Sequence, residues 1–255
     1  SNTHVRLEKI GWVRLSEKGR IPPNTKITNP RVTHDGVHWY ISVGVEIPNE
    51  EVELTNESIG IDLGLKDLAI VSNIEKPYKN INKTKRVKKV EKKLRRLQRQ
   101  VSRKYLKNKK GGSYCKTSNI VKLEKEIIKV HRNLDNIRTD YRHKTTSEIV
   151  KTKPSRIVME SLNVVGMMKN KHLSKAIAKQ GFYEFKAMIA YKSERQGTEF
   201  VESDKWYPSS KTCSFCGRVK AKLSLSERTF KCESCGIEMD RDKNASINLS
   251  RYKVS

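Results

Sequence analysis

Four of the five cysteines form two tight pairs toward the carboxyl end of the chain. The pairs are Cys213 with Cys216 and Cys232 with Cys235. Each Cys-x2-Cys turn directs two thiolates to one point, and two such turns close a tetrahedral site with no position left for water. Gly217 and Gly236 follow the two turns and suit the tight geometry that aims backbone amides at the sulfurs. The spacing predicts one structural Zn2+ ion. Cys115 has no partner at ligand spacing and is interpreted as an ordinary cysteine.

Three carboxylates far apart in the sequence are the candidates for catalysis. Asp62 interrupts the apolar segment IGIDLG, Glu160 follows the apolar segment RIVM, and Asp242 lies just beyond the second cysteine pair. An acid within an apolar strand is costly to bury unless it is paired or bound to metal. An arginine partner would explain any one of them equally well. Together they predict a shared Mg2+ or Mn2+ site, in which ions about 4 Å apart would activate a water and stabilise the leaving oxygen of a phosphodiester.

The net charge predicts a polyanionic partner. Lys and Arg number 54 and Asp and Glu 28, which gives a formal charge of +26. Residues 79–110 hold sixteen of these cations against the single acid Glu91, so +15 of the charge lies in this stretch. A solvated helix face normally mixes both signs. We therefore expect this stretch to contact nucleic-acid phosphates. The expected contacts are Lys88, Lys89, Lys92, Arg95, Arg96 and Arg99.

Apolar periodicity indicates the elements that position these residues. Within 79–110 and again within 120–141, apolar residues recur by threes and fours, and the turn-forming segment KKGGSYCKTS lies between the two runs. This predicts an antiparallel helical hairpin with its two apolar seams facing each other. The seams are Val87, Val90, Leu94, Leu97 and Val101 in the first helix, and Ile120, Leu123, Ile127, Val130, Leu134, Ile137 and Tyr141 in the second.

Several strands are also expected. Apolar residues alternate from Val37 to Val45 after the turn dipeptide Asp35-Gly36, which predicts a hairpin with one half-buried face. IGIDLG and LAIVSN predict a second hairpin that carries Asp62, and strands are expected at 156–164 and 198–204, with a helix at 182–195 before the last of these. In the segment WYPSSKT we expect Trp206 and Tyr207 to pack the cysteine-rich module onto the core, with base stacking as the alternative.

The quoted motifs also carry a family resemblance. GIDLGLKDLAIVSN, then VMESLNV, then WYPSSKTCSFCG, CESCG and DRDKNASINL resemble, in that order, the three RuvC-type nuclease motifs and the embedded zinc ribbon of TnpB, the OrfB-type protein of insertion sequences. The match covers about residues 30 to 252. It implies a Mg2+-dependent, RNA-guided DNA nuclease related to type V CRISPR effectors, with guide RNA and DNA as partners. By motif position Asp62, Glu160 and Asp242 are the catalytic acids, and Asp240 is the alternative for the third.

The resemblance also implies an α/β, RNase H-like (RuvC) core with an inserted basic helical hairpin, a zinc ribbon and a β-rich N-terminal segment. The family's longer N-terminal region, which recognises guide and target, is expected to be represented here only by its β-rich tail. The expected parts are 1–56 (tail of a wedge-like β domain), 57–78, 153–206 and 240–255 (RuvC-like parts I to III), 79–152 (basic hairpin) and 207–239 (zinc ribbon).

Two other functions have some support in the sequence. In the first, the chain binds nucleic acid through the basic helix and the zinc ribbon but does not cleave it. In the second, IGIDLG is the phosphate-binding hairpin of an actin-type ATPase, which would need a second similar domain with further Gly-rich loops, and we find neither in this sequence. Because no apolar run approaches the ~20 residues that span a bilayer, we expect a cytoplasmic protein of a prokaryotic cell or mobile element.

Overall fold

The computed structural model describes residues 3–21, 25–46, 52–224 and 226–253. The chain divides into two compact units, Ser1–Pro48 and Asn49–Ser255. Each unit is described separately. None of the helices in the described part of the chain is both long and apolar enough to cross a membrane.

The first unit consists of two antiparallel strand pairs. They are β1 (His4–Leu7) with β2 (Gly11–Arg14), and β3 (Ile27–His34) with β4 (Trp39–Val45). The Asp35 carboxylate accepts hydrogen bonds from the amides of Val37 and His38 and closes the expected turn between β3 and β4. The predicted alternation holds for Ile41, Val43 and Val45, which are half-buried. It is wrong for Trp39, which is 73% exposed at the turn end of the strand.

The second unit is built on one mixed sheet in the order β11-β10-β5-β6-β7. The strands are β5 (Thr55–Leu63), β6 (Asp67–Val71), β7 (Tyr78–Lys79), β10 (Pro154–Met159) and β11 (Glu199–Glu202). β5, β6 and β7 form an antiparallel meander, which confirms the expected hairpin around Asp62, and β10 and β11 extend the sheet in parallel with β5.

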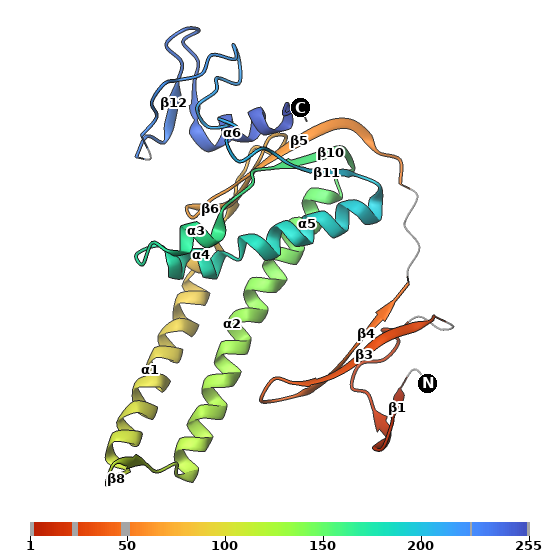
Figure 1. Ribbon diagram of the computed structural model, residues 1–255, viewed down its shortest axis with the longest axis vertical. Helices are drawn as coiled ribbons and strands as arrows, with labels where there is room; N and C mark the ends of the chain where they lie inside the picture. The colour runs from red at the N-terminus through yellow and green to blue at the C-terminus, as the bar shows by residue number, and fades with distance from the viewer. Residues whose placement is uncertain (1–2, 22–24, 47–51, 225, 254–255) are drawn as a thin grey trace. The chain divides into compact units, whose positions relative to one another are not determined.

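Helices cover both faces of this sheet (Figure 1). On one face, α2 (Ser118–Val150) and α5 (Phe182–Gln196) bury a core with the strands. That core includes Ile59, Ile61, Ile157, Met159, Ile149, Phe185 and Ile189. On the other face lies α6 (Arg241–Ser250). A Cβ at Gly60 of β5 would lie 2.0 Å from the Ser246 carbonyl oxygen of α6, so only glycine permits this approach.

The smaller elements connect these layers. The 3-10 turn η1 (Ile81–Lys83) precedes α1 (Lys85–Lys107), and the short strands β8 (Lys109–Lys110) and β9 (Ser113–Tyr114) join α1 to α2. The helices α3 (Val164–Met168) and α4 (Ser174–Gln180) follow β10. The cysteine-rich module contains β12 (Thr229–Lys231) and β13 (Glu238–Asp240).

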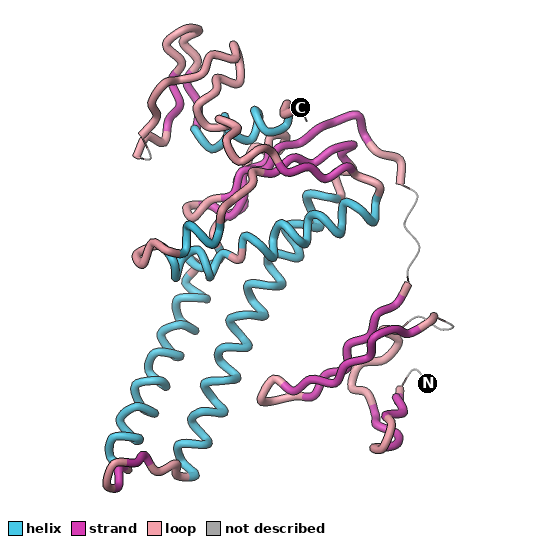
Figure 2. The backbone as a smooth tube through the Cα atoms, in the orientation of Figure 1, coloured by secondary structure: helices cyan, strands magenta, loops and turns pink. Residues whose placement is uncertain are grey.

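The helical hairpin of α1 and α2 is confirmed (Figure 2). It has a core of its own. Val87, Leu94, Leu97, Val130 and Leu134 are buried together, separately from the core of the sheet. Tyr141 was expected in this seam, and that expectation is wrong. It lies where α2 reaches the sheet, packs against the sheet core, and donates from its hydroxyl to the Lys79 carbonyl oxygen at 2.8 Å.

Candidate functional site

Asp62 and Glu160 lie next to each other at the carboxyl end of the parallel strands. β5 and β10 are in register at Ile61 and Met159, so the next residue along each strand is an acid. Side chains alternate between the two faces of a sheet. Since Ile61 and Met159 face the core under α2 and α5, the two carboxylates point to the face that α6 covers.

Helix α6 brings the third acid, Asp242, to the same place. The helix begins at Arg241, with Asp240 as its N-cap, and the Asp240 carboxylate accepts from the amides of Asp242 (2.9 Å) and Lys243 (3.1 Å). This use of Asp240 closes the first turn of the helix and sets the position of Asp242. Asp240 is exposed to solvent, whereas only 17% of the Asp242 side chain is exposed.

Lys243 anchors the start of α6 to the end of β6. Its ammonium group donates to the carbonyl oxygens of Val71 (3.0 Å), Ser72 (2.9 Å) and Ile74 (2.9 Å), which uses all three of its protons. Burial lowers the pKa of this lysine. Lys243 was not identified from the sequence, because a cation in a mostly polar helix start gives no signal that distinguishes it from its neighbours.

The three acids create a strongly negative, poorly solvated site. Burial raises the pKa of Asp62 well above its usual range, and the charges of Glu160 and then Asp242 raise it further, while Arg241 opposes them. Burial also raises the pKa of Glu160. Such crowding of carboxylates is favourable only when a cation or a proton compensates it.

Asp242 has a cationic partner in this structure. Arg241 places both Nε and Nη2 3.0 Å from Oδ1 of Asp242, and Arg228 Nη1 lies 3.8 Å from Oδ2. Within the described ranges, only the cysteine quartet brings three or more potential metal-ligand atoms within 4.8 Å of one another. Carboxylate oxygens are ligands that Mg2+ takes, and holding one ion among these three acids would require Asp242 to exchange the guanidinium for the metal.

The four cysteines converge as predicted and can hold one metal ion. Their sulfurs all lie within 4.8 Å of one another, with Cys213 to Cys235 and Cys216 to Cys232 both 3.6 Å apart. Four sulfurs at about 2.3 Å from a tetrahedral zinc would be about 3.8 Å apart, so the spacing fits this ion. A backbone hydrogen bond from Cys235 and a second from Ser234 contribute to lowering the pKa of Cys232 to about 6, as expected where amides point at a thiolate.

The surroundings of the quartet favour a metal over simple burial. Cys216 and Cys235 are exposed, and the small core beneath the other two contains Phe230 and Ile237. Gly217 and Gly236 both adopt φ of 76°, as the tight turns require. Cys115 lies outside this module, in the loop between β9 and α2.

Two asparagines of α6 attach the cysteine-rich module to the helix. Asn244 accepts from the Ser214 amide (2.9 Å) and donates to the Thr212 carbonyl oxygen (2.7 Å), and Asn248 donates to Thr212 and Ser209 carbonyl oxygens. Both asparagines are buried. Their spacing of four residues places them on one face of the helix, and this spacing in DRDKNASINL was the available signal for a role that sequence reasoning missed.

The expectation for WYPSSKT is only half right. Tyr207 donates from its hydroxyl to the Asn248 carbonyl oxygen at 3.0 Å and packs edge-on against Tyr252, with ring centroids 4.9 Å apart. Tyr207 therefore does pack this segment onto the core. Trp206 does not, because 81% of it is exposed.

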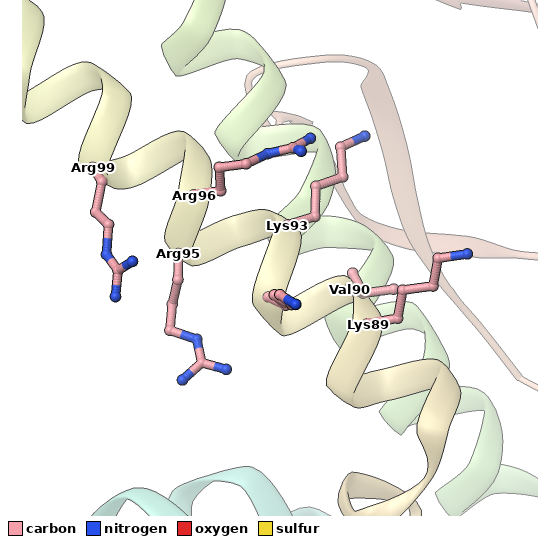
Figure 3. Close-up of a pocket in the computed structure, with 7 residues that line it drawn as sticks. Lys89, Val90, Lys93, Arg95, Arg96 and Arg99 are labelled. Carbon is pink, nitrogen blue, oxygen red and sulfur yellow. The ribbon is translucent and has the colours of Figure 1, made fainter.

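The predicted cationic residues form an exposed surface along α1. A hollow of about 670 Å3 lies among the long side chains of one helix, so it is an open surface and not an enclosed cavity. Figure 3 shows Arg95 and Arg99 directed to one side, with Lys93 and Arg96 on the other. The lining residues are Lys89, Val90, Lys92, Lys93, Arg95, Arg96 and Arg99. Lys93 lines the hollow although it is not among the expected contacts, whereas Lys88, which is, is exposed on the same helix but does not line it.

Glu91, the one acid of this stretch, is directed toward the rest of the fold. Its Oε1 lies 3.0 Å from Arg138 Nη2 of α2 and 2.5 Å from Lys179 Nζ of α4. These ion pairs tie together three helices. The acid therefore does not dilute the charge of the outward surface.

Comparisons with known proteins show two family matches and several relatives. Residues 40–171 match the OrfB_IS605 family model, described as "Probable transposase", and residues 182–249 match a model described as "Cas12f1-like, TNB domain". A Streptomyces pristinaespiralis protein named "Putative RNA-guided DNA endonuclease" is 32% identical over 94% of this chain and 55% of its own length. TnpB-like protein L79 of Acanthamoeba polyphaga mimivirus is 29% identical over 79% of this chain and 38% of its own.

The fold is shared with solved structures. The Cas12f1 chain of a complex with sgRNA and target DNA superposes with a TM-score of 0.53 at 20% identity, covering 88% of this chain and 56% of that one. A CRISPR-Cas12f ternary complex gives 0.56 at 20% identity over 85% and 43%. The chain spans about half the length of the curated relatives it matches first.

Replacing Asp62 with Asn should stabilise the protein at neutral pH when no divalent metal is added. The folded state raises the pKa of Asp62 above its unfolded value, so its ionisation opposes folding as the pH rises above the unfolded pKa. We expect Asp62→Asn to unfold at higher urea concentration at pH 7 and the difference to disappear near pH 3. Glu57→Gln, an exposed acid of the same strand, loses the same charge and should show no comparable gain. A less stable Asp62→Asn protein at pH 7 would show that the carboxylate is favourably paired.

Proposed function

Because the chain belongs to the OrfB_IS605 family of probable transposases, we propose that it is the nuclease part of a transposon-associated, RNA-guided DNA endonuclease. The observation that carries this proposal is the convergence of Asp62, Glu160 and Asp242 on one face of the sheet, where the charges of the other two acids raise the pKa of the first. The names of the relatives support RNA guidance and DNA as the substrate.

The sheet supports an RNase H-like (RuvC) core assembled from three separate segments. In this proposal, residues 57–78 contribute most of β5 to β7, residues 153–206 contribute β10 and β11, and residues 240–255 contribute α6. The hairpin 79–152 and the ribbon 207–239 are insertions between them, and 1–56 is the β-rich tail of a wedge-like domain. The first insertion includes the end of α2, where Ile149 and Val150 pack in the core of the sheet.

The three acids would hold Mg2+ or Mn2+. When bound, such ions supply an activated water and stabilise the leaving oxygen of an in-line phosphodiester displacement. The chain's own residues have defined tasks. Asp62 and Glu160 present carboxylates from neighbouring strands, Lys243 holds the start of α6 against β6, and Arg241 compensates the charge of Asp242 when no metal is bound.

Asp62→Ala should abolish metal-dependent cleavage of DNA. The chain would be purified from cells that express it, the bound RNA sequenced, and cleavage measured on DNA that matches any discrete RNA recovered. We expect cleavage with Mg2+ to fall by at least about a thousandfold, because one of the metal ligands is gone. Glu57→Ala, on the same strand, should cleave normally.

Two results would count against this function. Cleavage by Asp62→Ala at the wild-type rate would remove Asp62 from the mechanism. Steady nucleic-acid binding with no cleavage under any metal would favour the alternative, a binding protein that works through α1 and the ribbon.

We also propose that the cysteine quartet binds a structural Zn2+ ion. Cys213→Ser should lower the zinc content from one ion per chain to none and should loosen the ribbon, because its own apolar core is small. Cys115→Ser is the matched control and should retain the metal. Elemental analysis of the purified proteins measures both, and a zinc-free wild-type protein would contradict the assignment.

The surface of α1 is proposed to bind nucleic-acid backbone. Replacing Lys92, Arg95, Arg96 and Arg99 with Gln should make duplex binding less salt-dependent, with a slope shallower by about 0.9 for each phosphate that the protein no longer neutralises. The control replaces four cations that already have acidic partners, namely Arg20, Lys129, Lys144 and Lys231. It removes the same charge and should leave the slope nearly unchanged. An equal effect of both sets would place the interface elsewhere.

A further inference from the structure

Trp206 is the most exposed of the large apolar side chains that the structure describes, at 81%. It lies four residues beyond β11, the strand that pairs with β10 just before Glu160. The Ser203 amide donates to the carbonyl oxygen of Met159, the residue directly before Glu160, at 2.8 Å. Trp206 follows three residues later, at the same carboxyl end of the parallel strands.

The backbone around Trp206 is well fixed. The Asp204 amide donates to the Tyr252 hydroxyl at 3.1 Å, and the Trp206 amide donates to the Asp204 carboxylate at 2.7 Å. Tyr207, the next residue, is held by Asn248 of α6. The exposure of the indole ring therefore results from a defined turn, in which one aromatic residue packs inward and its neighbour is directed to solvent.

A cation accompanies the exposed ring. The Lys205 Nζ atom lies 5.1 Å from the centroid of the Trp206 ring. A nucleotide offers a flat base that stacks on an aromatic face and a phosphate that attracts an ammonium group. The Trp206 ring could stack on the base, and the ammonium group of Lys205 could contact the phosphate.

We propose that Trp206 stacks on an unpaired nucleobase and Lys205 contacts its phosphate, so that this pair holds a single strand beside Asp62, Glu160 and Asp242. The inference deepens the proposed nuclease function and rests on it. A protein partner could also cover an exposed tryptophan. The adjacent lysine, the hydrogen bond from Ser203 to the residue before Glu160, and the net charge of +26 favour nucleic acid.

The test uses Trp206 as its own probe. The chain has three tryptophans, and Trp12→Phe with Trp39→Phe leaves Trp206 as the only one. Oligothymidylate and an abasic oligonucleotide of the same length are titrated with no divalent metal added, so that neither strand is cut. We expect oligothymidylate to quench the fluorescence and the abasic strand to leave it largely unchanged, because only the first has bases to stack.

The affinities of Trp206 variants distinguish base stacking from a simple apolar contact. Trp206→Leu keeps an apolar side chain without a π-face and should bind oligothymidylate about tenfold more weakly, whereas Trp206→Phe should be weakened much less. On the abasic strand all three proteins should bind equally. The same tenfold weakening on both strands would indicate a disturbed turn and would overturn the proposal.

The remaining outcomes distinguish this inference from the function on which it rests. If single strands bind with steep salt dependence but without any response to Trp206, the stacking role fails and the proposed function stands. If neither strand nor duplex DNA binds, both fail. If Trp206 fluorescence responds to a co-purified protein and to no oligonucleotide, the surface belongs to a protein partner and the proposal is wrong.

Discussion

The close approach of α6 to β5 at Gly60 is the constraint on which the candidate site depends. With no side chain at that position, the helix backbone lies against the strand, and its first turn reaches the end of β5 where Asp62 is located. The opposite side of the same helix carries Asn244 and Asn248, which hold the cysteine-rich module. One helix thus fixes both the third acid and the ribbon, and Lys243 fixes the helix against β6.

The large elements could be predicted from the sequence because each has a simple period or spacing. The cysteine pairs, the hairpin around Asp62 and the two long helices follow from local patterns. What could not be predicted depends on contacts between distant segments. Nothing near Tyr141 shows that α2 leaves the helical seam there and meets the sheet, and adjacent aromatics in WYPSSKT gave no sign that Tyr207 turns inward and Trp206 outward.

The distribution of charge shows a similar limit. Counting residues located the cationic stretch but could not show where its single acid points. Glu91 is directed inward, between Arg138 and Lys179, so the outer surface is more uniformly positive than the count implies. For the acids of the candidate site, the sequence left two interpretations open, because each acid could also have been the buried partner of an arginine. For Asp242 that interpretation is also true in this structure, where Arg241 and Arg228 accompany it.

Because the helical hairpin has its own apolar core, its helices can differ in length without any change in the sheet. The hydrophobic cluster between α1 and α2 does not share its buried residues with the core of the sheet. Adding one heptad to each helix would lengthen the hairpin by about 10 Å and extend its cationic surface without moving any strand or acid. The reach of the protein along a polymer can therefore evolve by insertion of whole turns, while the geometry of the acids remains under separate selection.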